Sequence, residues 1–172
     1  MTGYLDTNLL SGLVKDDIDA TELIALRELL RLRRAGAIDL CTSHITREEL
    51  EKLPPGARAH HEDIYFLLDD VPIAGEHIVV GMLGTAVYGS VPYGGVLHIE
   101  DADLSLLRSI VPDRDDARHL FQAIRGGHVD YFITADKKTI VRFAAEIEAA
   151  FPLLVRTPSQ TIAELESASP AT

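Results

Sequence analysis

The chain has 172 residues, of which 47% are hydrophobic and 25% charged, and its formal net charge is −11. It is long enough to bury a core as one domain, and its single cysteine, Cys41, excludes an internal disulfide. The sequence shows neither a signal peptide nor an apolar run that would cross a bilayer, so we expect a cytoplasmic, soluble protein without a membrane partner. The acidic charge argues against a nucleic-acid partner, because affinity for phosphate normally comes from Lys and Arg.

Strands and helices are expected to alternate along the chain. The expected strands are residues 3–7, 37–41, 130–134 and 153–156. The expected helices are residues 8–15, 19–35, a short one near 45–50, 58–70, 114–125, 137–150 and one that begins after Thr157. Such alternation predicts a parallel sheet with helices on both faces. We therefore predict an α/β fold, a three-layer α/β/α sandwich formed by residues 1–166, with a disordered tail at 167–172.

Capping residues mark the ends of several expected helices. Gly36 ends the second helix, and Asp113 stands where the cap of a later helix belongs. Thr157, Pro158 and Gln160 combine a threonine cap, a proline in the first helical position and a glutamine three residues after the cap. This combination predicts the start of the last helix.

The middle of the chain is the least informative part. We interpret residues 54–110 as an insertion-like segment of the same domain. Residues 78–99 mix many glycines with Val, Tyr and Leu, which is consistent with a β-hairpin or with a flap. The glycines follow neither the phosphate-loop nor the dinucleotide-binding spacing, so we do not expect a nucleotide cradle there.

Three acids stand where an open α/β sheet places its ligands. Asp6 ends the first expected strand and Asp136 follows the strand at 130–134, so both belong at the carboxyl edge of the sheet. Asp116 lies beside the buried stripe in the first turn of its helix, where a carboxylate is costly unless it has a partner or a cation. Each acid taken alone is also what a turn, a cap or a helix N-terminus would use.

Other polar residues have simple structural interpretations. Glu48 and Glu49 are adjacent on the short helix, and adjacent glutamates usually form a solvated face. His60 and His61 lack the further ligands that a zinc site needs. His119 lies one turn after the acid of its helix and would border the site, although a hydrogen-bonded helix histidine is the simpler interpretation.

Five segments, in their order along the chain, resemble those of the PIN-domain family. They are Asp-Thr-Asn at 6–8, Ser-His-Ile-Thr-Arg-Glu-Glu-Leu at 43–50, Asp-Ala-Arg-His-Leu at 116–120, Phe-Ile-Thr-Ala-Asp at 132–136 and Val-Arg-Thr-Pro at 155–158. The resemblance covers the first fifty residues and residues 113–166.

The resemblance assigns one acid to each of four segments. The family's second acid directly precedes a leucine and so corresponds to Glu49. The other three correspond to Asp6, Asp116 and Asp136, with Asp113 or Asp115 as substitutes for the third.

The resemblance implies a Mg²⁺- or Mn²⁺-dependent endoribonuclease. One form of this enzyme is the VapC-like ribonuclease, the toxin of a toxin–antitoxin pair. RNA would be the substrate, and an antitoxin protein and a second copy of the chain are the implied partners. The four acids would be both catalytic residues and ligands of the cation, since hard carboxylate oxygens suit Mg²⁺ and Mn²⁺. The residues expected to support these ligands are Thr7, Asn8 and Thr134. The residues expected to contact phosphate are Lys137, Lys138, Arg27, Arg31 and Arg34, although the arginines also fit a solvated helix face.

Two other functions are compatible with the same residues. A PIN-fold binding or scaffold module without turnover would agree better with the acidic net charge and the long glycine-rich middle. A phosphatase that forms an aspartyl phosphate on Asp6 would normally carry a second acid two residues later, where this chain has Asn8.

Overall fold

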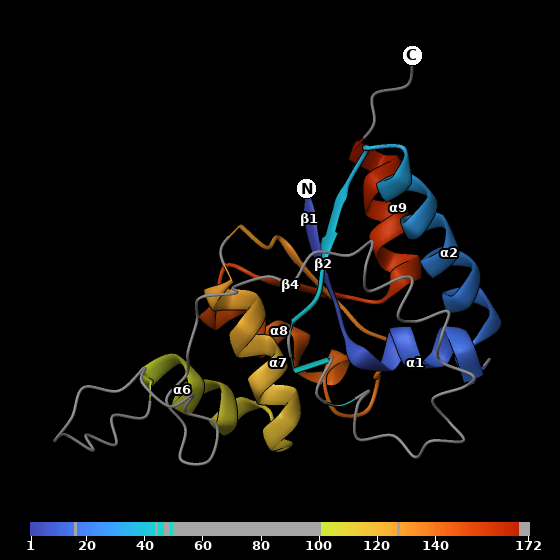
Figure 1. Cartoon of the computed structure of the whole chain (residues 1–172). Coiled ribbons are helices and arrows are strands. Elements are labelled where there is room, and N and C mark those ends of the chain that lie inside the picture. The colour runs from blue at the N-terminus through green and yellow to red at the C-terminus, as the bar shows by residue number, and fades with distance from the viewer. Residues whose placement is uncertain (16, 44, 47–48, 50–100, 127, 169–172) are drawn as a thin grey trace, which may run out of the picture.

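The computed structural model describes residues 1–15, 17–43, 45–46, 49, 101–126 and 128–168 (Figure 1). The described strands form one four-stranded parallel sheet in the order β2-β1-β3-β4. The strands are β1 (Thr2–Leu5), β2 (Asp39–Cys41), β3 (Tyr131–Ile133) and β4 (Leu154–Arg156). The predicted α/β class and parallel sheet are confirmed.

Alternation along the strands separates two apolar cores. Tyr4 and Phe132 point to one face of the sheet, and their neighbours Leu5 and Ile133 point to the other. The first face is covered by α6 (Ala102–Ile110), α7 (Arg114–Arg125) and α8 (Ala144–Ala150). The second is covered by α1 (Thr7–Lys15), α2 (Ala20–Arg34) and α9 (Pro158–Ala168), of which α2 and α9 lie side by side (Figure 1). The result is a three-layer α/β/α sandwich.

Close approach across the sheet explains the glycine in the first strand. A side chain on Gly3 would place its Cβ 2.6 Å from Cδ1 of Ile133, well inside contact distance. Gly36 has a positive φ of 71°, the conformation that ends α2 and turns the chain toward β2. Cys41 is buried.

The predicted helix caps are confirmed. Asp113 accepts hydrogen bonds from the backbone N–H groups of Asp115 (2.9 Å) and Asp116 (3.1 Å) at the start of α7. At the start of α9 the backbone N–H of Gln160 donates to the Thr157 hydroxyl (3.4 Å), and that of Thr157 donates to Oε1 of Gln160 (2.9 Å). This reciprocal pair satisfies two of the N–H groups that a helix start leaves free.

Three local expectations need correction. The helix expected over 137–150 begins only at Ala144, after a turn and the 3-10 helix η2 (Val141–Phe143), because Asp136 captures the backbone N–H groups that follow it. Helix α6 was not predicted, although Asp101 caps it. Helix α9 runs through Ala168, two residues into the expected tail.

Several expectations concern residues outside the described part of the chain. They are the helix at 58–70, the hairpin or flap at 78–99, the histidines at 60 and 61, most of the insertion-like segment 54–110 and residues 169–172 of the tail. The end of that segment, residues 102–110, is α6.

Within the described ranges, no helix has the length and apolar character that crossing a bilayer requires.

Candidate functional site

The carboxyl edge of the sheet is polar between its two central strands. The chain leaves β1 toward β2 on one side, while β3 pairs with β1 on the other, so the order of strands reverses between β1 and β3. A crevice beyond such a reversal is where open α/β sheets bind ligands. Asp6 follows β1 and donates its backbone N–H to the carbonyl of Ile133 (3.1 Å), which ties the two strand ends together.

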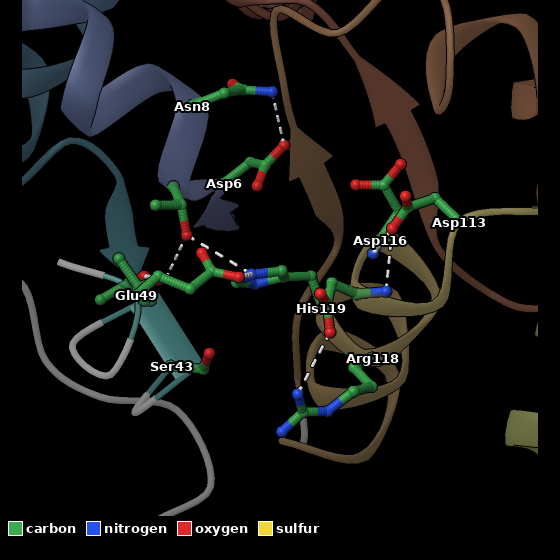
Figure 2. Close-up of polar contacts among 12 residues, drawn as sticks. Asp6, Asn8, Ser43, Glu49, Asp113, Asp116, Arg118 and His119 are labelled. Atoms are coloured by element: carbon green, nitrogen blue, oxygen red, sulfur yellow. Dashed lines mark hydrogen bonds and ion pairs between the residues drawn. The ribbon is translucent and has the colours of Figure 1, made fainter. Parts of the chain in front are cut away.

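Asp6 is buried and held by two side chains. It is only 5% exposed, and its Oδ2 accepts from Nδ2 of Asn8 (2.8 Å; Figure 2) and from the hydroxyl of Thr134 (2.7 Å). Burial raises the pKa of this carboxyl group, and the charge of Glu49 adds to the rise, while His119 and the Thr134 hydroxyl oppose it. The predicted supporting positions Asn8 and Thr134 therefore do contact an acid.

Asp136 is stabilised by the turn that it creates. Its Oδ1 accepts from the backbone N–H groups of Lys138 and Thr139, both at 2.8 Å, and its own N–H donates to the hydroxyl of Thr134 (3.0 Å). Burial works to raise the pKa of Asp136, but these backbone donors and the charge of Lys138 bring it below its usual value. Asp136 is thus ionised more easily than Asp6 or Asp116.

Asp116 is half-buried in the first turn of α7. Its pKa is raised from 3.8 to about 6, mainly by burial, and the charges of Asp113, Asp6 and Asp136 contribute to this rise. The nearby Thr139 hydroxyl lowers this pKa, yet its oxygen is buried and makes no hydrogen bond of normal geometry within the described part of the chain. The predicted cost of a carboxylate at this position is confirmed, and burial outweighs repulsion as its cause.

Glu49 reaches the edge through His119. Residues 45, 46 and 49 are helical, and Oε1 of Glu49 lies 3.2 Å from Nε2 of His119 (Figure 2). His119 is 3% exposed, and Glu49 and the charges of Asp6 and Asp116 raise its pKa even though burial works to lower it. The acids around His119 therefore favour its protonated form.

A chain of hydroxyl groups continues from His119 into the core. Nδ1 of His119 lies 2.9 Å from the Tyr4 hydroxyl, which donates to the hydroxyl of Ser43 (2.6 Å). Thr7, predicted to support the acids, lies 3.4 Å from Nε2 of His119 and donates to Thr46 (3.1 Å). Burial raises the pKa of Tyr4 far above its usual range, so its hydroxyl keeps its proton.

The four predicted acids thus act on one another electrostatically across this edge. Asp6 influences the pKa of Asp116 and is itself influenced by Glu49, and Asp136 influences Asp116. However, no three His, Cys, Asp or Glu side chains within the described ranges are placed so that together they could hold a metal ion. Asp6 and Asp136 instead face hydrogen-bond donors of their own, and Glu49 faces His119.

The predicted phosphate contacts fall at opposite ends of the molecule. Lys137 and Lys138 directly follow Asp136, and they line a cavity of about 410 Å³ together with Asn8, Ser11 and Glu22. Arg31 and Arg34 lie in the last turn of α2, next to the start of β2 and therefore at the amino edge of the sheet. Arg31 is paired with Glu28 (2.6 Å), and Arg27 lies in the middle of α2. Lys137 and Lys138 therefore border the acids, whereas Arg31 and Arg34 do not.

Two side chains of α7 differ from their sequence interpretation. The spacing of apolar residues along α7 predicts a solvated position for Gln122, yet Gln122 is 3% exposed, and its Oε1 has no hydrogen bond to a described residue. His119 was assigned a structural role beside the site, yet it contacts one of the four acids directly. Its spacing of three residues after Asp116 was the available signal; the contact with Tyr4, 115 residues away, was not visible in the sequence.

Comparisons of the chain with protein-family models, with curated proteins and with solved structures found no match.

Proposed function

We propose that this protein is a PIN-like, Mg²⁺- or Mn²⁺-dependent endoribonuclease that hydrolyses RNA phosphodiester bonds at the carboxyl edge of its sheet. One observation carries the proposal: Asp6, Glu49, Asp116 and Asp136 come from four distant segments and influence one another's charge at a single strand crossover. A toxin paired with an antitoxin, and a homodimer, are forms of the same proposal that the resemblance supports.

The donor chemistry at this edge fits a hard divalent cation. Carboxylate oxygens are the ligands that Mg²⁺ and Mn²⁺ prefer, and two of the acids have raised pKa values because burial leaves their charge poorly compensated. The buried Thr139 hydroxyl beside Asp116, without a partner in the described part of the chain, is a further oxygen available to a ligand. Asp6, Asp116, Asp136 and Glu49 would hold the cation, and binding requires their carboxylate groups to converge more closely than the described side chains do here.

A bound divalent cation would activate water for attack and stabilise negative charge on the phosphodiester. Side chains of the protein would orient an acid and supply positive charge for the RNA. Asn8 and Thr134 fix the orientation of Asp6 through hydrogen bonds of 2.8 and 2.7 Å. Lys137 and Lys138 supply positive charge beside Asp136, where a phosphate of the RNA would lie.

A second candidate is a binding or scaffold module with this fold and no turnover. It is favoured by the net charge of −11 and by the side-chain placement, in which no three described ligand groups converge on a metal position. In that case the acids would bind a basic surface of a partner protein.

The two candidates are separated by activity measurements on the purified full chain. We expect cleavage of some members of a broad RNA panel in Mg²⁺ or Mn²⁺, abolished by EDTA. The substitution Asp6→Asn should reduce cleavage by at least about a thousandfold, equivalent to about 4 kcal/mol of transition-state stabilisation. The matched control is Asp115→Asn, which removes an exposed acid that pairs with Arg118 (3.3 Å). A wild-type protein that neither cuts any RNA nor binds a divalent ion would leave the scaffold module as the better description.

A further inference from the structure

His119 is the connection between the acidic edge and the core. It lies on α7 one turn after Asp116, and its ring is almost completely buried. Its two ring nitrogens face different partners: Nε2 faces Glu49 (3.2 Å) and Thr7 (3.4 Å), and Nδ1 faces the Tyr4 hydroxyl (2.9 Å). A histidine with both nitrogens engaged cannot rotate without losing hydrogen bonds in a buried environment.

The partner on the far side of the ring is itself fixed. Tyr4 is fully buried and stacks on Phe132, with ring centroids 5.2 Å apart and planes inclined by 13°. Its hydroxyl donates its single proton to Ser43 (2.6 Å), so its oxygen is left to accept from Nδ1 of His119. Strand β1 and the segment after β2 therefore set the orientation of the imidazole ring.

Glu49 is linked directly to this arrangement through His119. Asp6 is held by Asn8 and Thr134, and Asp136 is held by backbone N–H groups of its own turn. Glu49 comes from a separate helical segment, its side chain is 31% exposed, and Oε1 faces His119. The contact with His119 joins that segment to α7 across the edge.

We propose that His119 is a positioning residue that holds Glu49 in the acidic edge through a Ser43–Tyr4–His119–Glu49 relay of hydrogen bonds. This inference rests on the proposed function, because it assigns Glu49 a ligand role. Partners that orient a ligating carboxylate typically contribute a factor of about 10 to 100 in metal affinity. Loss of His119 should therefore weaken cation binding without removing any of the four acids.

The test is a Mn²⁺ titration of the full-chain protein, followed by electron paramagnetic resonance, for the wild type and four variants. We expect His119→Leu to weaken Mn²⁺ binding by about 10- to 100-fold. His119→Gln keeps a donor for Glu49 and should recover much of that loss. Tyr4→Phe keeps the stack on Phe132 and removes only the far hydroxyl of the relay, so it should weaken binding by a smaller factor.

Gln122→Leu is the matched control for these variants. Gln122 is buried on the same helix, one turn after His119, and its Oε1 has no hydrogen bond to a described residue, so Mn²⁺ affinity should stay within twofold of the wild type. Tyr4→Phe keeps the inference testable if His119→Leu fails to fold.

The outcomes separate this inference from the proposed function. Wild-type protein that binds Mn²⁺ but cuts no RNA overturns the nuclease, and the comparison of variants still decides the role of His119. A folded His119→Leu protein that binds Mn²⁺ as the wild type does, or an equal loss in His119→Gln and His119→Leu, overturns the positioning role alone. Wild-type protein that binds no Mn²⁺ overturns both.

Discussion

Replacing Asp116 with asparagine should stabilise the metal-free protein at neutral pH. The pKa of Asp116 rises from 3.8 to about 6 on folding, so the folded state holds this proton more tightly than the unfolded state does. The corresponding stability is fully present below pH 3.8 and is lost as the pH rises through about 6. Above that window the ionised carboxylate destabilises the fold, and a neutral asparagine avoids the cost.

The size of this effect follows from the shift in pKa. One pKa unit corresponds to about 1.4 kcal/mol, so a rise of about two units corresponds to about 3 kcal/mol. Because Asp116 is only half-buried, solvent screens part of the interaction, and we expect a gain of about 1.5 kcal/mol. For a domain of this size that gain raises the melting temperature by about 3 to 6 °C.

The assay is thermal unfolding in EDTA, followed by circular dichroism, at pH 7.5 and pH 4.5. Asp116→Asn should melt above the wild type at pH 7.5, and the difference should shrink by more than about half at pH 4.5. The control Asp115→Asn changes an exposed acid in the same turn and loses the pair with Arg118, so it should not stabilise. A neutral or destabilising effect of Asp116→Asn at pH 7.5 would refute the electrostatic account of this edge.

Three further outcomes test other parts of the structure. The buried Glu22 accepts hydrogen bonds from the backbone N–H and the hydroxyl of Ser159 at 2.9 and 3.0 Å. Glu22→Ala should therefore lower the free energy of unfolding, measured by urea titration, by about 2 kcal/mol. A loss below about 0.5 kcal/mol would show that this contact does not anchor α9. Burial raises the pKa of the Cys41 thiol to about 12, so a thiol-specific reagent at pH 8 should label it only after unfolding; rapid labelling of native protein would contradict its burial. Arg156 forms ion pairs with both Glu148 and Glu164. Arg156→Met should therefore destabilise the fold by about 1 to 3 kcal/mol, while RNA cleavage per folded molecule is unchanged. A parallel loss of cleavage by folded protein would place Arg156 in the site.

The sequence was informative where local chemistry determines structure. The cap at Asp113 and the reciprocal pair of Thr157 and Gln160 were predictable, because a helix start needs acceptors for its N–H groups whatever surrounds it. The placement of Asp6 and Asp136 at one edge followed from the parallel sheet alone. Helix α6 carried similar information in the cap at Asp101, but it was obscured by the uninformative segment before it.

Features that depend on distant residues could not be predicted in the same way. The helix expected from residue 137 fails because the carboxylate of Asp136 binds the N–H groups of Lys138 and Thr139 and holds them in a turn. Gln122 is buried because of packing that its helical position alone does not reveal. The contact of His119 with Tyr4 joins residues 115 positions apart. Local patterns thus locate the acids along the chain, while the groups that orient them are determined by tertiary structure.

A crystal structure of the protein soaked in Mn²⁺, with anomalous data, tests the central claim most directly. We predict an anomalous peak among Asp6, Glu49, Asp116 and Asp136, with their carboxylates drawn together around the ion. Crystals saturated with Mn²⁺ that show no peak at this edge would contradict this prediction.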